Sequence, residues 1–292
     1  MIDGVTRHLT LPDQRRLAFL DFGSGEQGTW IHCHGIPGSR MELRHLEEDL
    51  TRAGLRIIVP DRPGYGESSS AEDYDFTAHS HDIAALADHL GIERFSLSGF
   101  SGGGVFALAV AKELGHRIDQ LGLAATPAAP LLENPFDHVS ELTANAWQAA
   151  NNGPGHLASM LEALTDSHQQ LTDAMINATN ETERHYLTSS HVFPGIQSNM
   201  QAAVAQGPAI PAHAMARDTL LIIHPWSFEL RSLSVSARLV HGEVDAIIHA
   251  NHLTALTSSI PGSQAEFIAK KGHYSVLPSI WGLQLKDLPP QR

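Results

Sequence analysis

Ser101 lies in a glycine-rich segment whose residue types could carry out nucleophilic catalysis. The segment reads Gly99-Phe100-Ser101-Gly102-Gly103, and it follows an apolar strand-like run and precedes an apolar helical run. A serine held at a sharp turn between a strand and a helix needs small neighbours, because other side chains would collide with those two elements. The first turn of the helix would also offer N–H groups to a developing oxyanion. The pattern therefore predicts a nucleophile at Ser101.

A histidine and two carboxylates later in the chain could activate this serine. The serine hydroxyl needs a base to take its proton, and the imidazole of His273 has the chemistry for that role. A carboxylate on the other imidazole nitrogen would fix the ring tautomer and stabilise the cation. Asp245 and Glu243 both follow a strand-like run, and we favour Asp245 because Glu243 lies nearer the strand. The expected catalytic residues are Ser101, Asp245 and His273.

Three neighbouring residues, His32, Cys33 and His34, could suggest a metal site. In a strand, however, Cys33 would point away from the face that carries the two histidines, and no nearby carboxylate or second cysteine completes a ligand set. A later pair, His79-x-His81, does not share a helical face and is predicted to be solvated. The sequence therefore predicts no metal and no other cofactor.

The segments that would position these residues alternate between strands and helices. Strands are predicted at residues 29–33, 55–60, 94–97, 118–124, 237–241 and 265–268, after an N-terminal hairpin of residues 7–11 and 17–22. Helices are predicted at residues 41–53, 76–90 and 105–114, with a terminal helix around 278–285. This alternation implies a mostly parallel sheet with helices on both faces, in which loops at the carboxyl ends of strands carry the chemistry.

A long stretch before the strand at 237–241 has a different pattern. From about residue 127 to 225 it contains helical segments at 139–150, 157–164, 171–178 and 196–205 but no convincing strand. We predict an α/β core of residues 1–126 and 226–292 and a helical cap (lid) of residues 127–225. Its large apolar and aromatic residues could line a pocket, although each more often packs inside a lid: Phe136, Trp147, Met160, Tyr186, Phe193, Met200 and Trp226.

Four motifs, in this order, make the chain similar to the α/β-hydrolase superfamily. They are His34-Gly35-Ile36-Pro37, Asp61-Arg62-Pro63-Gly64-Tyr65-Gly66, the serine segment, and Gly242-Glu243-x-Asp245 with Gly272-His273. The resemblance covers nearly all of the chain outside the insertion. It implies an α/β-hydrolase fold with a helical cap, and catalytic residues in the order Ser, Asp, His.

The same resemblance implies roles for further residues. The backbone N–H groups of Ile36 and Gly102 are expected to form the oxyanion hole. Candidate pocket residues are His34, Phe100, Trp147 and Trp226, with a scaffold role favoured for His34. Asp61 and Arg62 are expected to pin their own loop.

The leading hypothesis for function is a cofactor-independent serine hydrolase. It would form an acyl-enzyme on Ser101 and cleave an ester or related acyl bond of a small, apolar molecule. The resemblance implies that epoxide hydrolases and haloalkane dehalogenases of the superfamily use a carboxylate nucleophile, so a serine argues against those activities. The open alternatives are a C–C bond hydrolase, an amidase, a lyase, a cofactor-free oxygenase, or a ligand-binding protein on the same fold.

The composition limits the partners of such an enzyme. The 292 residues carry a formal net charge of -13, which disfavours a nucleic-acid surface, and no apolar run reaches the length of a membrane span. The N-terminal residues lack the pattern of a secretory signal. Cys33 is the only cysteine, which rules out an internal disulfide and fits a reducing compartment. We expect a cytoplasmic enzyme with a small-molecule substrate and no nucleic-acid or membrane partner, of unspecified oligomeric state.

Overall fold

An eight-stranded sheet forms the centre of the computed structural model, which describes residues 4–283. In spatial order its strands are β1 (Val5–Thr10), β2 (Arg16–Gly23), β4 (Arg56–Pro60), β3 (Thr29–Cys33), β5 (Phe95–Phe100), β6 (Ile118–Ala124), β7 (Ala237–Gly242) and β8 (Gln264–Ile268). The first strand pairs antiparallel with the second, and the second pairs antiparallel with β4. The remaining neighbours pair in parallel, as the alternating sequence pattern predicts.

β3 and β5 lie side by side in the sheet, although β4 stands between them in the sequence. From β3 the chain moves to one side to form β4, and from β5 it moves to the other side through β6, β7 and β8. Loops that leave two such strands diverge, which opens a crevice at their carboxyl ends. The loop that begins at His34 follows β3, and Ser101 follows β5, so the topology brings these two motifs together.

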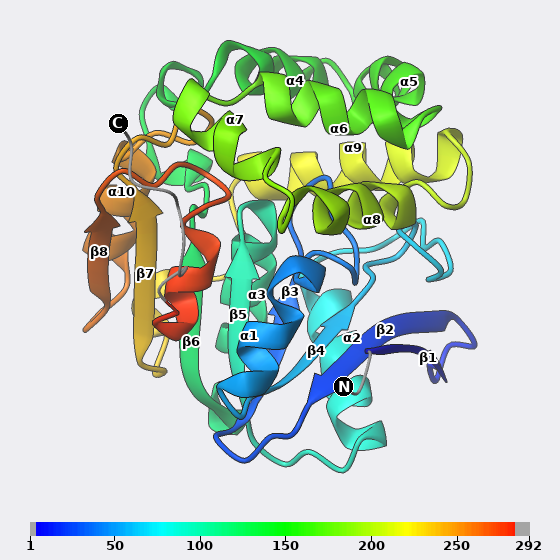
Figure 1. Ribbon diagram of the computed structural model, residues 1–292, viewed down its shortest axis with the longest axis vertical. Coiled ribbons are helices and arrows are strands. Elements are labelled where there is room, and N and C mark those ends of the chain that lie inside the picture. Colours follow the sequence, from blue (N-terminus) through cyan, green and yellow to red (C-terminus); the bar gives the residue numbers. More distant parts are fainter. Residues whose placement is uncertain (1–3, 284–292) are drawn as a thin grey trace.

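Helices cover both faces of the sheet, and each face has its own apolar cluster (Figure 1). The first face carries α2 (Phe76–His89), α3 (Gly102–Glu113) and α10 (Asn251–Ser259), and the second carries α1 (Glu47–Arg52) and a 3-10 helix at Leu277–Trp281. On β4, Ile58 belongs to the first cluster while its neighbours Ile57 and Val59 belong to the second. This alternation of side chains is what a strand buried on both sides requires. The predicted α/β fold is therefore confirmed.

A group of helices lies over the carboxyl end of the sheet, between β6 and β7 in the sequence (Figure 1). It consists of α4 (Glu141–Asn151), α5 (Pro154–Thr165), α6 (His168–Asn177), α7 (Glu181–Leu187), α8 (Phe193–Ala203) and α9 (Ala209–Ile223). A third apolar cluster contains residues of α6, α7, α8 and α9 together with Tyr65, which belongs to the loop after β4. The division of the chain into a core and a separate cap stays a prediction.

The structure differs from the expected elements in several places. Two helices of this group, α7 and α9, are absent from the predicted set, and so is α10. The predicted helix at 41–53 is α-helical only at Glu47–Arg52, after a 3-10 turn. The predicted terminal helix is a 3-10 helix at Leu277–Trp281, and residues 284–285 of that prediction lie outside the described residues. Between residues 4 and 283, no helix has both the length and the apolar character needed to cross a membrane.

Candidate active site

Ser101 occupies a strained turn between β5 and α3. Its backbone has φ 50° and ψ −130°, a combination that residues other than glycine rarely adopt, and α3 begins at the next residue. The surrounding glycines are required by close backbone packing. A Cβ at Gly103 would lie 2.2 Å from the carbonyl oxygen of Cys33, and one at Gly99 would lie 2.7 Å from the oxygen of Gly103. The first turn of α3 therefore packs directly against the end of β3 and against the end of β5.

Asp245 and His273 are paired beside this turn. The Nδ1–H of His273 donates to Oδ2 of Asp245 at 2.8 Å, which leaves Nε2 free to accept a proton. The other carboxylate oxygen, Oδ1, accepts the N–H groups of Ile247 at 2.8 Å and Ile248 at 3.0 Å. The acid and the base are both almost fully buried. Each oxygen of Asp245 thus has a distinct task, one in the loop and one on the imidazole.

The electrostatics of the pair favour an ionised Asp245. Burial alone would raise the pKa of this carboxyl group, but the charge of His273 and the hydrogen bond to it outweigh burial and hold the pKa below the usual 3.8. Glu243, the rival acid, is exposed to solvent, and its carboxylate accepts the N–H of Lys270 at 3.3 Å. The structure therefore places Asp245, and not Glu243, on the imidazole.

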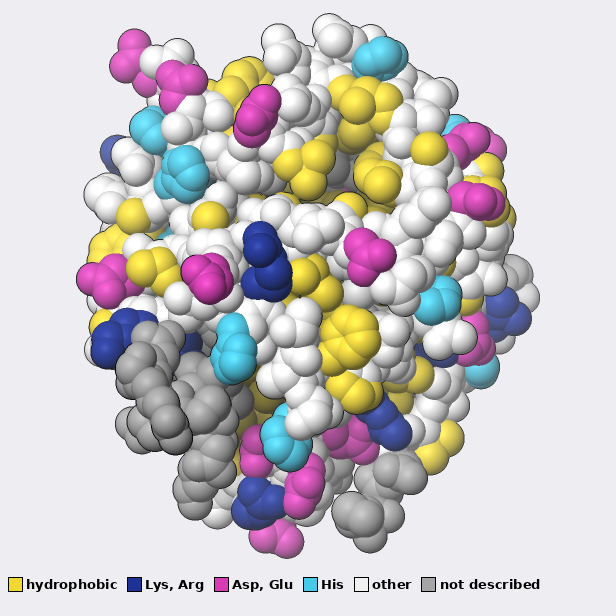
Figure 2. All heavy atoms as spheres, turned by 45° about the horizontal axis from the view of Figure 1, so that its top comes forward, with side chains coloured by type: hydrophobic (Ala, Val, Ile, Leu, Met, Phe, Trp, Pro, Cys, Tyr) yellow, Lys and Arg dark blue, Asp and Glu magenta, His cyan; other side chains and the backbone are white. Residues whose placement is uncertain are grey.

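Ser101 and His273 line a common cavity of about 250 Å³ between the sheet and the helices above it. Gly102 and Ile36 also line it, and a Cβ at Gly102 would lie 2.6 Å from Cδ1 of Ile36, so the side chain of Ile36 packs directly against Gly102. The rest of the wall is largely apolar: Phe100, Leu142, Trp147, Leu157, Met160, Leu161, Leu164, Leu171, Met175, Met215, Ile222, Ile247 and Ile248. Hydrophobic side chains also gather around a hollow on the face that carries the upper helices (Figure 2).

A buried hydrogen-bond chain holds the loop that contains Ile36. The carboxylate of Glu42 accepts the N–H of Gly35 at 2.9 Å through Oε1, and its Oε2 lies 2.8 Å from Nε2 of His32. The other ring nitrogen of His32 lies 2.9 Å from the hydroxyl of Ser98 on β5. With the proton on Nε2, His32 donates to Glu42 and accepts from Ser98. The loop is thereby tied to the strand that delivers the serine.

His34 and Arg62 brace the same loop from below. His34 is fully buried; its Nδ1 lies 2.9 Å from the carbonyl oxygen of Gly35, and its Nε2 accepts the backbone N–H of Arg62 at 3.1 Å. Burial, with the charge of Arg62, holds the pKa of His34 well below its usual value, so this ring is neutral. The Arg62 guanidinium donates to the carbonyl oxygen of Gly35 at 2.8 Å and to Asp218 of α9 at 2.7 Å. Arg62 therefore links the loop after β3 to α9, through Asp218, which lies 156 residues after Arg62 in the chain.

The predicted pocket residues divide into two groups. Phe100 and Trp147 line the cavity with Ser101. His34 and Trp226 lie elsewhere among the described residues: His34 is part of the scaffold, and Trp226 stacks on Phe228, with ring centroids 5.5 Å apart, beyond the end of α9. α9 supplies part of the wall through Met215, Thr219 and Ile222, and sequence reasoning misses these residues because it predicts no helix there.

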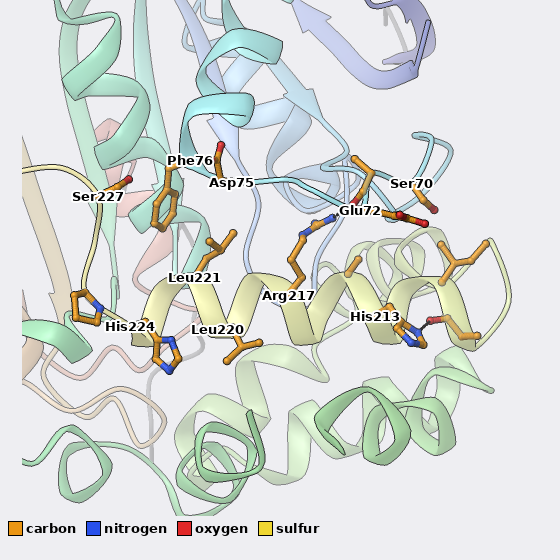
Figure 3. Close-up of a pocket in the computed structure, with 16 residues that line it drawn as sticks. Ser70, Glu72, Asp75, Phe76, His213, Arg217, Leu220, Leu221, His224 and Ser227 are labelled. Carbon is orange, nitrogen blue, oxygen red and sulfur yellow. Dashed lines mark hydrogen bonds between the residues drawn. The ribbon is translucent and has the colours of Figure 1, made fainter. Parts of the chain in front are cut away.

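A larger and more open hollow, of about 800 Å³, lies on the other side of α9 (Figure 3). Four of its polar side chains already have partners within the protein. Arg217 pairs with Asp218, Asp75 caps α2, His213 bonds a carbonyl oxygen of its own helix, and His224 lies 2.9 Å from Asn151. Neither Ser101 nor His273 lines this hollow. The candidate chemistry therefore belongs to the smaller cavity.

Comparison with known proteins identifies the family of the chain. A sequence model of the α/β hydrolase fold family matches residues 31–279, and the chain therefore belongs to this family of hydrolases. The solved structure of a thermophilic esterase from Thermogutta terrifontis, with malate bound, superposes with a TM-score of 0.67 and 26% identity, covering 94% of this chain and 93% of that chain.

Curated relatives carry other activities in their names. The chain is 28% identical over 182 residues to the bifunctional epoxide hydrolase 2 of Sus scrofa, which is 61% of this chain and 31% of that protein. It is 32% identical over 129 residues to haloalkane dehalogenase 2 of Mycobacterium bovis, which is 42% of this chain and 44% of that protein. These matches span less than half of each relative, so they support the family and leave the reaction to the site.

Proposed function

We propose that the protein is a serine hydrolase that cleaves an ester or related acyl bond of a small, apolar molecule. The hydroxyl of Ser101 attacks the carbonyl carbon while Nε2 of His273 takes its proton. The N–H groups of Gly102 and Ile36 stabilise the oxyanion. When the C–O bond breaks, the leaving alcohol takes the proton from His273 and the acyl group stays on Ser101. A water molecule then gives a proton to the same imidazole and attacks the acyl carbon. The bond between the acyl carbon and the serine oxygen breaks, the imidazolium returns the proton to that oxygen, and the acid is released.

The pairing of Asp245 with His273, on the wall of the cavity that Ser101 also lines, carries this proposal. This pairing leaves Nε2 of the oriented imidazole as the atom that can accept the proton of Ser101. Opening an epoxide or displacing a halide through a covalent ester would instead need a carboxylate nucleophile at the turn between β5 and α3, where this chain has Ser101. The names of the epoxide hydrolase and dehalogenase relatives therefore do not transfer to the proposed reaction.

The character of the cavity supports a neutral, apolar substrate. Among its described lining residues, the ionisable side chains are His273 and Tyr274, and no lysine, arginine or carboxylate is present. A substrate with an ionised acyl chain would lose its hydration there without gaining a partner of opposite charge. Leu142 and Met160, which are 52% and 48% exposed, also line the cavity and would give an apolar entrance.

Hydrolysis of 4-nitrophenyl butyrate by the wild-type protein and by Ser101→Ala tests the proposal. We expect turnover in the wild type and only the spontaneous rate in the variant. A matched ester with a terminal carboxylate, 4-nitrophenyl hemisuccinate, should have a much lower kcat/KM. Equal rates for wild type and Ser101→Ala would refute the acyl-enzyme mechanism, and absence of turnover in a wild type that still binds apolar ligands would favour a ligand-binding protein.

A further inference from the structure

The loop that carries His273 is held by a buried carboxylate from α7. Glu183 lies in the first turn of that helix, and only 2% of its surface is exposed. Its Oε1 accepts the N–H groups of Tyr274 and Ser275, the second at 2.7 Å, and its Oε2 accepts the hydroxyl of Ser275 at 2.7 Å. The same hydroxyl oxygen accepts the N–H of Gly272 at 3.0 Å. One side chain thereby fixes the main chain on both sides of His273.

The glycine before His273 is explained by this contact. A Cβ at Gly272 would lie 2.2 Å from Oε2 of Glu183 and 2.7 Å from its Cδ. Any larger residue would push the carboxylate away or displace the loop. The approach of α7 therefore requires the glycine of the Gly272-His273 motif.

The start of α7 also contacts the loop that carries the acid. Asn180 caps the helix, because its Oδ1 accepts the N–H of Glu183 at 2.9 Å. Its side-chain amide donates to the carbonyl oxygen of Val244 at 2.7 Å, one residue before Asp245. A single helix end therefore holds the loop of the acid and the loop of the base in a fixed relation.

Burial of a carboxylate costs free energy unless charge-assisted hydrogen bonds satisfy it. Glu183 accepts such hydrogen bonds from the main chain next to His273. We propose that Glu183 is a positioning residue for the proposed catalytic base. It keeps the imidazole of His273 in the place where Nδ1 meets Asp245 and the ring lines the cavity that Ser101 also lines. The inference rests on the proposed serine-hydrolase function, and it makes α7 a working part of the catalytic apparatus.

The test compares Glu183→Ala with Glu183→Gln. The glutamine oxygen can still accept the two N–H groups, and its NH₂ can donate to the hydroxyl of Ser275, so we expect kcat within a few-fold of wild type. Alanine leaves both N–H groups without their acceptor. We expect kcat for 4-nitrophenyl butyrate to fall about 10- to 100-fold, as for other small misplacements of catalytic groups, with KM nearly unchanged. The rate at which a fluorophosphonate labels Ser101 should fall in parallel.

Two further variants complete the design. Glu181→Gln removes the same charge from the same turn of α7, but Glu181 is exposed, so kcat should not change. If Glu183→Ala does not fold, Ser275→Ala removes only the hydroxyl link and should lower kcat several-fold. A folded Glu183→Ala with wild-type kcat and labelling rate, or with a change in KM alone, overturns the positioning role. Activity that survives in Ser101→Ala would instead remove the serine-hydrolase proposal, whatever Glu183 does.

Discussion

Replacement of Asp245 by asparagine tests the proposed acid–base pair most sharply, because the structure dictates how the new amide must sit. Oδ1 of Asp245 accepts two backbone N–H groups, from Ile247 and Ile248. In the variant, the amide oxygen is the only atom that can accept them, so the NH₂ group must face His273. The imidazole can then meet it only by accepting at Nδ1, which puts the ring proton on Nε2. That nitrogen can no longer take a proton from Ser101.

The size of the effect follows from the wrong tautomer. The same exchange in the best-studied serine proteases lowers kcat by about 10⁴, which corresponds to about 5.4 kcal/mol of activation free energy at 25 °C. The fold should change little by comparison. One charge-assisted hydrogen bond weakens while the two loop hydrogen bonds remain, which costs about 1 to 3 kcal/mol of unfolding free energy.

The assay is steady-state hydrolysis of 4-nitrophenyl butyrate, with Ser101→Ala as the zero and urea unfolding as the check on folding. Glu243→Gln is the matched control, because it also removes one negative charge near the end of β7 but from an exposed side chain. It should retain nearly full activity. A folded Asp245→Asn within tenfold of wild type would refute the tautomer argument, and a crippled Glu243→Gln would show that the wrong carboxylate was chosen.

Three further predictions concern stability and the loops around the site. Gly104→Ala would place a Cβ 2.0 Å from Oγ1 of Thr126, so we expect the unfolding free energy to fall by about 1 to 3 kcal/mol. Thr126→Ala should partly restore it in a double-mutant cycle, and additive losses of unfolding free energy would contradict the contact. Glu42→Ala should lower both kcat and unfolding free energy, because it leaves buried donors unpaired. In Glu42→Gln the amide oxygen can still accept the N–H of Gly35, and the NH₂ can donate to Nε2 of His32 once the ring proton moves to Nδ1, so this variant should lose less; identical behaviour of the two variants would argue against this chain of hydrogen bonds. Burial lowers the pKa of His79 to about 3 and that of His252 to about 4, so both rings stay neutral in the folded protein while the unfolded chain takes up protons below about pH 6.5. The contribution of these two residues to the unfolding free energy is complete above about pH 6.5. Below that pH it is lost, by about 1.4 kcal/mol per residue per pH unit down to about pH 4. An unfolding free energy that is equal at pH 7 and pH 5 would exclude this contribution.

The order of the elements and the residues that could do chemistry can be predicted from the amino-acid sequence. Apolar runs of strand length predict β3, β4 and β6 nearly to the residue, because a buried strand must be apolar along its length. Ser101 could be recognised because its constraint is local: the sharp turn needs glycines at fixed offsets in the chain. The fold and the family predicted from these signals are confirmed by the observed sheet and by the family match.

The contacts between residues far apart in the chain could not be predicted and become visible only in the folded protein. His79 is a clear case, because the helical pattern predicts a solvated ring, whereas the structure buries it with Nδ1 2.9 Å from the hydroxyl of Tyr74. Trp226, a predicted pocket residue, stacks on Phe228 outside the cavity, whereas His34 lies in the scaffold, the role favoured for it on the sequence.

The contacts that hold the loops of the proposed active site show the physical reason. Glu183 is 91 residues from Tyr274, and Arg62 is 156 residues from Asp218. A hydrogen bond between such partners imposes no periodicity on either segment, and a charged residue in a helix usually reads as a solvated one. The chain therefore reveals the residues that local geometry constrains, whereas the partners that fix them in place emerge only when α7 and α9 pack over the sheet.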